Sequence, residues 1–93
     1  MLEKHIEQDV CRYARKKGWV VYKFTSPGTR GVPDRIFMRD GVVFFIEFKS
    51  PGQKPSRLQE CVHRRIREQG IDVYVVDGIE QGCKLIDDVS YSF

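Results

Sequence analysis

The chain of 93 residues is long enough for one domain with a modest hydrophobic core. It contains no run of about 20 apolar residues, which excludes a membrane span, and its charged N-terminus does not resemble a signal peptide. We therefore expect a cytoplasmic, intracellular protein without membrane contact that forms one domain over residues 1–93. The formal net charge is +3, but residues 12–57 carry +8 and residues 72–93 carry −4. Such a basic segment favours a polyanionic partner such as nucleic acid, with an ordinary solvated surface as the alternative.

Hydrophobic periodicity and turn residues predict the elements of the chain. In chain order these are a helix over residues 2–17, strands over 19–24, 35–38 and 42–49, a helix over 56–69, a strand over 72–76, and a short helical turn over 79–83. The inward stripe of the second helix is expected to consist of Leu58, Val62 and Ile66. Asp40-Gly41 predicts a tight hairpin. The order α-β-β-β-α-β predicts an α/β fold with a central mixed four-stranded sheet flanked by helices.

Two charged residues interrupt the apolar strand that is predicted at 42–49. Glu47 and Lys49 are two residues apart, so their side chains leave the same face of the sheet. Asp34 and Glu47 each lie about six residues from the hairpin turn, which places both carboxylates at the same end of adjacent strands. Two carboxylates within reach of one ion are typical of a Mg²⁺ site. The alternative is an exposed strand edge with an ordinary ion pair.

The spacing of Pro33-Asp34 and Glu47-Phe48-Lys49 resembles the motif of the PD-(D/E)xK nuclease superfamily. The string Arg30-Gly31-Val32-Pro33-Asp34-Arg35 and the downstream Gln59 make the resemblance more specific. Both are similar to the VRR-NUC family of virus-type replication-repair nucleases, and the resemblance covers residues 3–80. It implies a restriction-endonuclease-like fold, in agreement with the predicted order of elements.

The resemblance implies a role for each residue of the motif. Asp34 and Glu47 would bind Mg²⁺, with Mn²⁺ able to replace it, and the backbone carbonyl of Phe48 would be a further ligand. Lys49 would position the attacking water and stabilise the charge that develops on the phosphate, a role that we prefer to that of a general base. Glu7 would lie near the metal, directly or through a water, and its alternative is a solvated charge on the first helix.

Further residues are assigned around this site. Gln59 would point into it and bond a carboxylate or a phosphate, and its alternative is a satisfied polar residue of the core. Four basic residues flank the motif and are candidate phosphate contacts, with solvated surface charges as the alternative: Arg30, Arg35, Lys54 and Arg57. His5 and His63 have no partner at metal-binding spacing and are predicted to have no functional role.

The predicted function is that of a Mg²⁺-dependent, structure-selective DNA endonuclease. The resemblance implies branched substrates, such as Holliday junctions or flaps, that arise in DNA repair, recombination or replication. It also implies a homodimer, because two active sites related by a two-fold axis suit a four-way junction. Two alternatives stay open: a non-specific or restriction-type DNA nuclease, and a catalytically inactive nucleic-acid-binding module.

Overall fold

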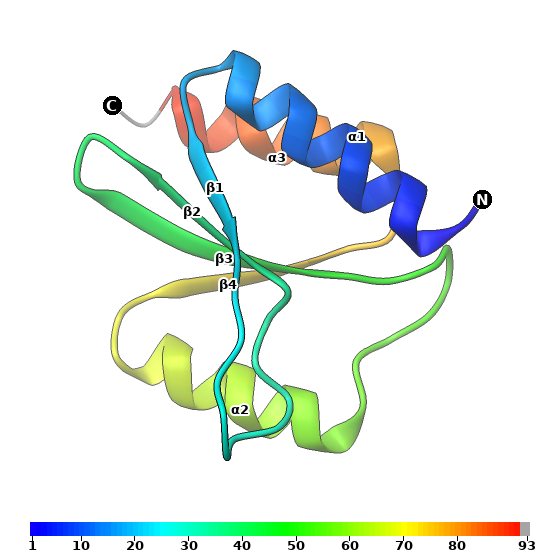
Figure 1. Ribbon diagram of the computed structural model, residues 1–93, viewed down its shortest axis with the longest axis vertical. Coiled ribbons are helices and arrows are strands. Elements are labelled where there is room, and N and C mark those ends of the chain that lie inside the picture. The colour runs from blue at the N-terminus through cyan, green and yellow to red at the C-terminus, as the bar shows by residue number, and fades with distance from the viewer. Residues whose placement is uncertain (92–93) are drawn as a thin grey trace.

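The computed structural model describes residues 1–91, in which helices cover both faces of one sheet (Figure 1). The elements follow one another as α1 (Glu3–Lys16), β1 (Val20–Lys23), β2 (Arg35–Arg39), β3 (Val42–Phe48), α2 (Arg57–Glu68), β4 (Asp72–Val76) and α3 (Ile79–Ser90). The predicted α/β fold is confirmed, and the first six elements lie within one residue of their predicted bounds. No helix within residues 1–91 combines the length and the apolar character needed to cross a bilayer.

The sheet has the strand order β1-β2-β3-β4. Strands β1, β2 and β3 pair antiparallel, whereas β3 and β4 are parallel neighbours joined through α2, so the sheet is mixed. Arg39 pairs with Val42, which leaves Asp40 and Gly41 as a two-residue hairpin loop. Both loop residues have positive φ, 49° and 81°, as the tight turns that match the twist of two antiparallel strands require. This turn fixes the register that brings the ends of β2 and β3 together.

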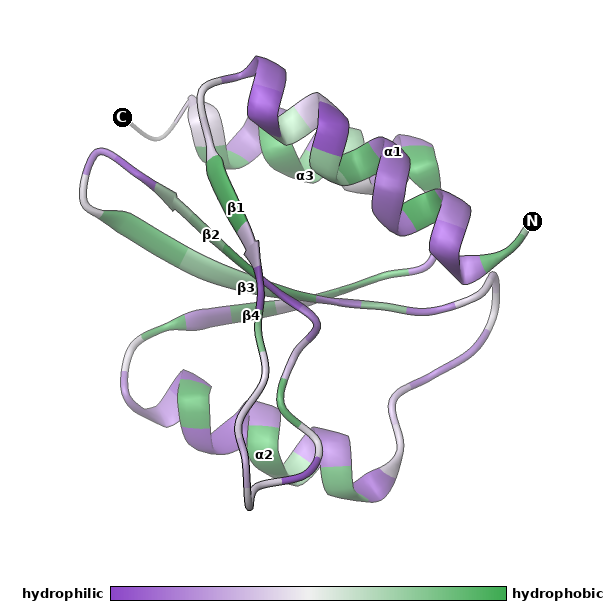
Figure 2. Ribbon diagram, viewed as in Figure 1, coloured by the Kyte–Doolittle hydropathy of each residue, from purple (hydrophilic) through white to green (hydrophobic). Residues whose placement is uncertain are grey.

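The two faces of the sheet are covered differently. Helices α1 and α3 lie side by side on one face, and α2 lies on the other (Figure 1). Alternation along β3 points Phe44, Ile46 and Phe48 toward α1 and α3, where they join the main hydrophobic core. The residues between them, Phe45 and Glu47, point toward α2. In Figure 2 the strands of the central hairpin are largely hydrophobic, whereas α1 alternates between hydrophilic and hydrophobic bands, as expected of a helix with one buried face.

The prediction of a short helical turn at 79–83 is incomplete: a helix does begin at Ile79, but α3 continues to Ser90. Ile86 is fully buried in the core, and the helix is held to the rest of the fold near its C-terminal end. There the Tyr13 hydroxyl donates to Asp87 at 2.7 Å, and Nε1 of Trp19 donates to Oγ of Ser90 at 3.0 Å. These partners are more than 70 residues away in sequence, so tertiary contacts extend a helix that local pattern does not reveal.

The predicted inward stripe of α2 is wrong by one position. Leu58 is 50% exposed, and Val62 and Ile66 are only half-buried. The buried residue of this helix is instead His63, at 1% exposure. A shift by one residue turns the face of a helix by about 100°. The polar stripe that contains His63 therefore lies over the sheet, and the predicted apolar stripe does not.

Close packing of α1 against α3 depends on Gly82. A Cβ at this position would overlap with Cγ2 of Val10 and would stand 3.0 Å from Cγ1 of Val76. We expect Gly82→Ala to lower the free energy of unfolding by about 1–2 kcal/mol, because over-packing outweighs the roughly 1 kcal/mol that alanine gains in helix propensity. Urea unfolding measures the change. Gly78→Ala is the matched control, since no atom lies within 4 Å of a Cβ there; equal stability of the two variants would contradict the prediction.

Candidate active site

The structure brings Asp34 and Glu47 together at one end of the central hairpin. Asp34 immediately precedes β2, and Glu47 is the second-to-last residue of β3. Because Arg35 pairs with Ile46, the next residues outward along the two strands are Asp34 and Glu47. The hairpin geometry therefore places the two carboxylates on neighbouring strands, as the count from the turn predicts.

Asp34 closes the end of the hairpin by bonding to the backbone of β3. Its Oδ2 accepts a hydrogen bond of 2.8 Å from the backbone N–H of Phe48. In a β-strand the N–H and C=O of one residue project to the same side. The carbonyl of Phe48 therefore projects to the same side as Asp34, and the family resemblance implies that this carbonyl is a metal ligand.

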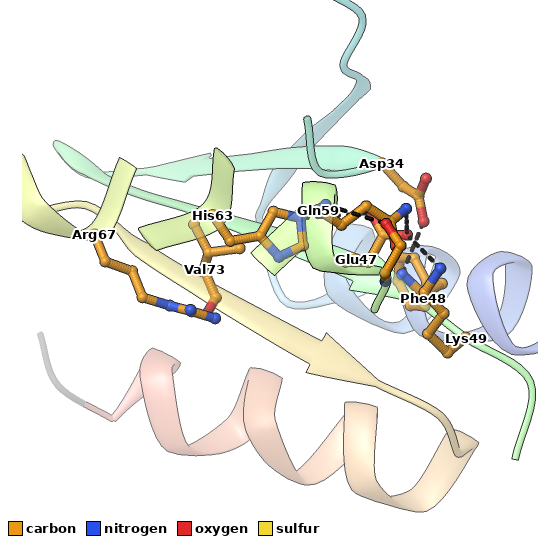
Figure 3. Close-up of polar contacts among 9 residues, drawn as sticks. Asp34, Glu47, Phe48, Lys49, Gln59, His63, Arg67 and Val73 are labelled. Atoms are coloured by element: carbon orange, nitrogen blue, oxygen red, sulfur yellow. Dashed lines mark hydrogen bonds and ion pairs between the residues drawn. The ribbon is translucent and has the colours of Figure 1, made fainter. Parts of the chain in front are cut away.

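The Glu47 carboxylate is the most deeply buried acid of the site, with 3% of its side chain exposed. Its Oε2 lies 3.2 Å from Nζ of Lys49 and accepts a 3.0 Å hydrogen bond from Nε2 of Gln59 (Figure 3). Its Oε1 has no hydrogen-bond partner and lies 3.9 Å from Nε2 of His63. One oxygen is thus held by two donors, while the other faces a histidine.

Gln59 is positioned by the start of α2. Ser56 caps this helix: its side chain accepts from the backbone N–H of Gln59 at 3.1 Å, and the Gln59 side-chain oxygen accepts from the backbone N–H of Ser56 at 2.9 Å. This reciprocal capping box leaves the amide nitrogen of Gln59 free to donate to Glu47. The structure therefore places Gln59 in the site, and the same side chain both caps the helix and holds the acid.

Burial and the negative charge of nearby acids perturb both carboxyl groups. Burial, and then the charge of Asp34, raise the pKa of Glu47 to about 7, although Lys49 opposes the shift. The pKa of Asp34 is also raised, mainly by burial, while the hydrogen bond from Phe48 lowers it. Both acids thus hold protons more tightly than free carboxyl groups do, a pattern that is frequent at functional sites.

Glu7 lies at this end of the sheet, but its carboxylate is engaged by an arginine. Its Oε2 lies 2.6 Å from Nε of Arg35, and both side chains are less than one-fifth exposed. Glu7 still contributes to the raised pKa of Asp34. Arg35, predicted as a phosphate contact, therefore has one face occupied by an internal ion pair.

Sequence reasoning passed over Glu3, which lies one turn before Glu7 on α1. Its charge contributes to the raised pKa of both Asp34 and Glu47, so it lies in the neighbourhood of both acids. A spacing of four residues on a helix was the available signal, since it puts Glu3 and Glu7 on one face. Within residues 1–91, however, no three His, Cys, Asp or Glu side chains gather closely enough to hold an ion by themselves.

His63 was predicted to have no functional role, yet it contacts the site. Burial, followed by the charges of Arg67 and Lys49, lowers its pKa, so the imidazole is neutral at physiological pH.

The other predicted basic residues are on the surface: Arg30, Lys54 and Arg57 are exposed. They are accessible to a phosphate backbone, whereas His5 is an exposed residue of α1.

Two comparisons with known proteins point to a nuclease. No protein-family model matches the chain. The chain is 44% identical over 77 residues to the "Putative nuclease p44" of Acyrthosiphon pisum secondary endosymbiont phage 1, covering 82% of this chain and 78% of that protein. A solved VRR_NUC domain superposes with a TM-score of 0.85 at 31% identity, over 91% of this chain and 94% of the other. Sequence, fold and the placement of the motif agree, and the chain belongs to the VRR-NUC family of nucleases.

Proposed function

We propose that the protein is a divalent-metal-dependent DNA endonuclease, with residues 1–93 as one nuclease domain. The observation that carries the proposal is the pair of acids, the buried Glu47 and the half-buried Asp34, beside the Lys49 ammonium. Burial, and then the charges of neighbouring acids, raise the pKa of both groups, so keeping both ionised is costly even with Lys49 beside them. A divalent cation between them would relieve that cost.

The donor set suits Mg²⁺. The available groups are carboxylate oxygens and the carbonyl of Phe48, and hard oxygen donors of this kind select Mg²⁺ or Mn²⁺ rather than zinc. Mg²⁺ is commonly held by one or two carboxylates, with water and substrate phosphate filling its other positions. Asp34 and Glu47 would hold the ion, the Phe48 carbonyl would complete the protein ligands, and Glu7 or Glu3 would act through water. Mn²⁺ is expected to replace Mg²⁺.

The residues around the acids suit phosphodiester hydrolysis. When bound, the metal supplies Lewis acidity and lowers the pKa of a coordinated water. Lys49, held against Oε2 of Glu47, presents positive charge where negative charge develops on the phosphate during in-line attack. Gln59 fixes the orientation of Glu47 through the same oxygen. Four basic residues would hold the DNA backbone: the exposed Arg30, Lys54 and Arg57, and the outer face of Arg35.

Branched DNA is the substrate that we propose, and its cleavage would take place inside the cell during repair, recombination or replication. The family membership of the chain supports the nuclease activity. The small chain offers four strands and three helices within residues 1–91, all engaged in the core or the site, and little structure with which to read a base sequence. Recognition of DNA shape through phosphate contacts therefore fits better than recognition of a sequence.

We also propose a homodimer, which an exposed apolar face of the sheet supports. Val20 and Tyr22 on the edge strand β1 are 46% and 62% exposed and point away from α1. Their cross-strand partners, Met38 and Ile36, continue the face onto β2. Helix α2 packs on β4 and leaves this part of the sheet open. A second copy of the chain covering the face would bury it and pair two active sites.

Replacing Glu47 by glutamine tests the cost of the buried acid. Because the folded pKa of about 7 lies above the ordinary 4.5, the metal-free protein is stabilised at low pH and loses that contribution as the pH rises through 7. The loss is at most roughly 3 kcal/mol, and Glu47→Gln should abolish it, so that the variant is the more stable protein at pH 8 without metal. Urea unfolding between pH 5 and 8 measures this. Mn²⁺ should stabilise the wild type at pH 8 but not the variant. Glu60→Gln is the control, because Glu60 is an exposed acid. If the free energy of unfolding depended on pH in the same way for the wild type and Glu47→Gln, the prediction would be refuted.

A cleavage panel tests the activity and its substrate. Four-way junctions, flaps and matched duplexes of mixed sequence are incubated with Mg²⁺, with Mn²⁺ or with a chelator. Junctions or flaps should be cut fastest, and the chelator should abolish cleavage. Lys49→Ala should lower the rate by about 10²–10³-fold, because it removes charge stabilisation in the transition state. Arg12→Ala, on the exposed surface of α1, is the control.

Each failure of this panel has a distinct meaning. Unchanged cleavage by Lys49→Ala would contradict the assignment of the site. Equal rates on every substrate would contradict structure selectivity and favour a non-specific nuclease. Binding without cleavage under all conditions would favour an inactive nucleic-acid-binding module.

The dimer is tested by charge on the apolar face. Light scattering coupled to sizing chromatography should give the wild type about twice the chain mass of 10.9 kDa. The double variant Val20→Lys with Tyr22→Lys should give the mass of one chain, because desolvating two ammonium groups opposes association. Lys23→Glu is the control, since this exposed residue of the same strand points to the other side. A wild type near 10.9 kDa would contradict the proposal.

A further inference from the structure

Two buried polar atoms at the back of the site face one another without a hydrogen bond. Among the described residues these are Oε1 of Glu47 and Nε2 of His63. They lie 3.9 Å apart, and their side chains are 3% and 1% exposed. A buried polar atom without a partner costs about 1–3 kcal/mol, and a histidine in an apolar role would be better replaced by a hydrophobic residue. The pair therefore calls for an explanation.

The imidazole belongs to a polar stripe along α2. Gln59, His63 and Arg67 recur at every fourth residue, so they lie along one face of the helix, which Figure 3 shows directed toward β3 and β4. At one end Gln59 is fixed by the capping box and by Glu47. At the other end Arg67 donates two hydrogen bonds, of 3.0 and 2.7 Å, to the carbonyl of Val73. His63 stands between these two anchors of the helix.

Residues on two successive turns of α2 thus lie against the two oxygens of the Glu47 carboxylate. Gln59 donates to Oε2, and His63 faces Oε1. A neutral imidazole has one N–H, and placing it on Nε2 makes His63 a donor toward Glu47. A movement of about 1 Å brings the two atoms to ordinary hydrogen-bond distance. Lys49 is paired with Oε2, the oxygen that His63 does not face.

We propose that His63 is a positioning residue, whose Nε2–H donates to Oε1 of Glu47 and fixes the direction in which this carboxylate is presented to a divalent cation. The inference rests on the proposed metal dependence. With Oε1 tied to His63 and Oε2 guided by Gln59, the carboxylate cannot rotate about its Cγ–Cδ bond. Outer partners of metal ligands act in this way, and their loss commonly costs 10–100-fold in metal affinity.

Metal affinity tests the proposal without any need for substrate. Mn²⁺ is titrated into the purified full-length chain by calorimetry, and each variant is checked for folding by circular dichroism. His63→Phe, similar in shape but without a donor, should bind Mn²⁺ about 10–100-fold more weakly than the wild type. His63→Gln, whose terminal amide can reach Oε1, should restore binding to within about threefold of the wild type. Ile66→Ala, one turn further along α2, controls for a general loosening of the helix.

The outcomes separate the two proposals. A wild type that binds no Mn²⁺ would overturn the proposed metal dependence and the role of His63 with it. A wild type that binds, together with a His63→Phe variant no weaker than Ile66→Ala, would overturn the positioning role alone. Should His63→Phe fail to fold, His63→Asn decides the question. Its amide is too short to reach Oε1, so the same loss of affinity supports the proposal and retained affinity overturns it.

Discussion

The burial of one carboxylate governs the arrangement of this protein. Glu47 lies on a central strand under a helix, where an unpaired charge costs several kcal/mol. The fold meets this cost from several elements: β3 contributes Lys49 just beyond its end, and α2 contributes Gln59 and faces the acid with His63. Helix α2 consequently turns a polar stripe, and not its apolar one, toward this part of the sheet. The polar interface between α2 and the sheet thus serves to support Glu47.

Much of this arrangement follows from the sequence alone. The strand at 42–48 is apolar except for Glu47, and a two-residue turn at Asp40-Gly41 fixes which residue of β2 lies opposite each residue of β3. Counting outward from the turn was enough to bring Asp34 beside Glu47, because a hairpin is a local structure. The start of α2 at Ser56 was likewise predicted, and the structure adds the capping box between Ser56 and Gln59. Local rules therefore locate the acids and begin the supporting helix at the right residue.

Non-local packing explains what the sequence could not provide. The rotation of α2 depends on the segment between β1 and β2, which runs down to this helix and back (Figure 1). Gly31 in that segment approaches so closely that an added Cβ would lie 3.2 Å from Leu58 and 3.3 Å from Val62. The apolar side of α2 is thus covered in part by a loop, which leaves the next position, His63, to face the sheet. The pairing of Glu7 with Arg35 escaped prediction for the same reason, since their partners are set by how α1 lies on the sheet.

The segment between β1 and β2 therefore contributes to the site in two ways. The segment that ends in Pro33-Asp34 contributes one carboxylate to the site and, at Gly31, packs closely against the helix that holds the second carboxylate. Gly31 has a φ of +89°, so a side chain there would meet both backbone strain and the crowding of Leu58. The glycine and the aspartate lie three residues apart in the string by which the family resemblance was found. Within a few residues, that string therefore contains a turn that packs against α2 and an acid, Asp34, that lies beside Glu47, the carboxylate that α2 supports.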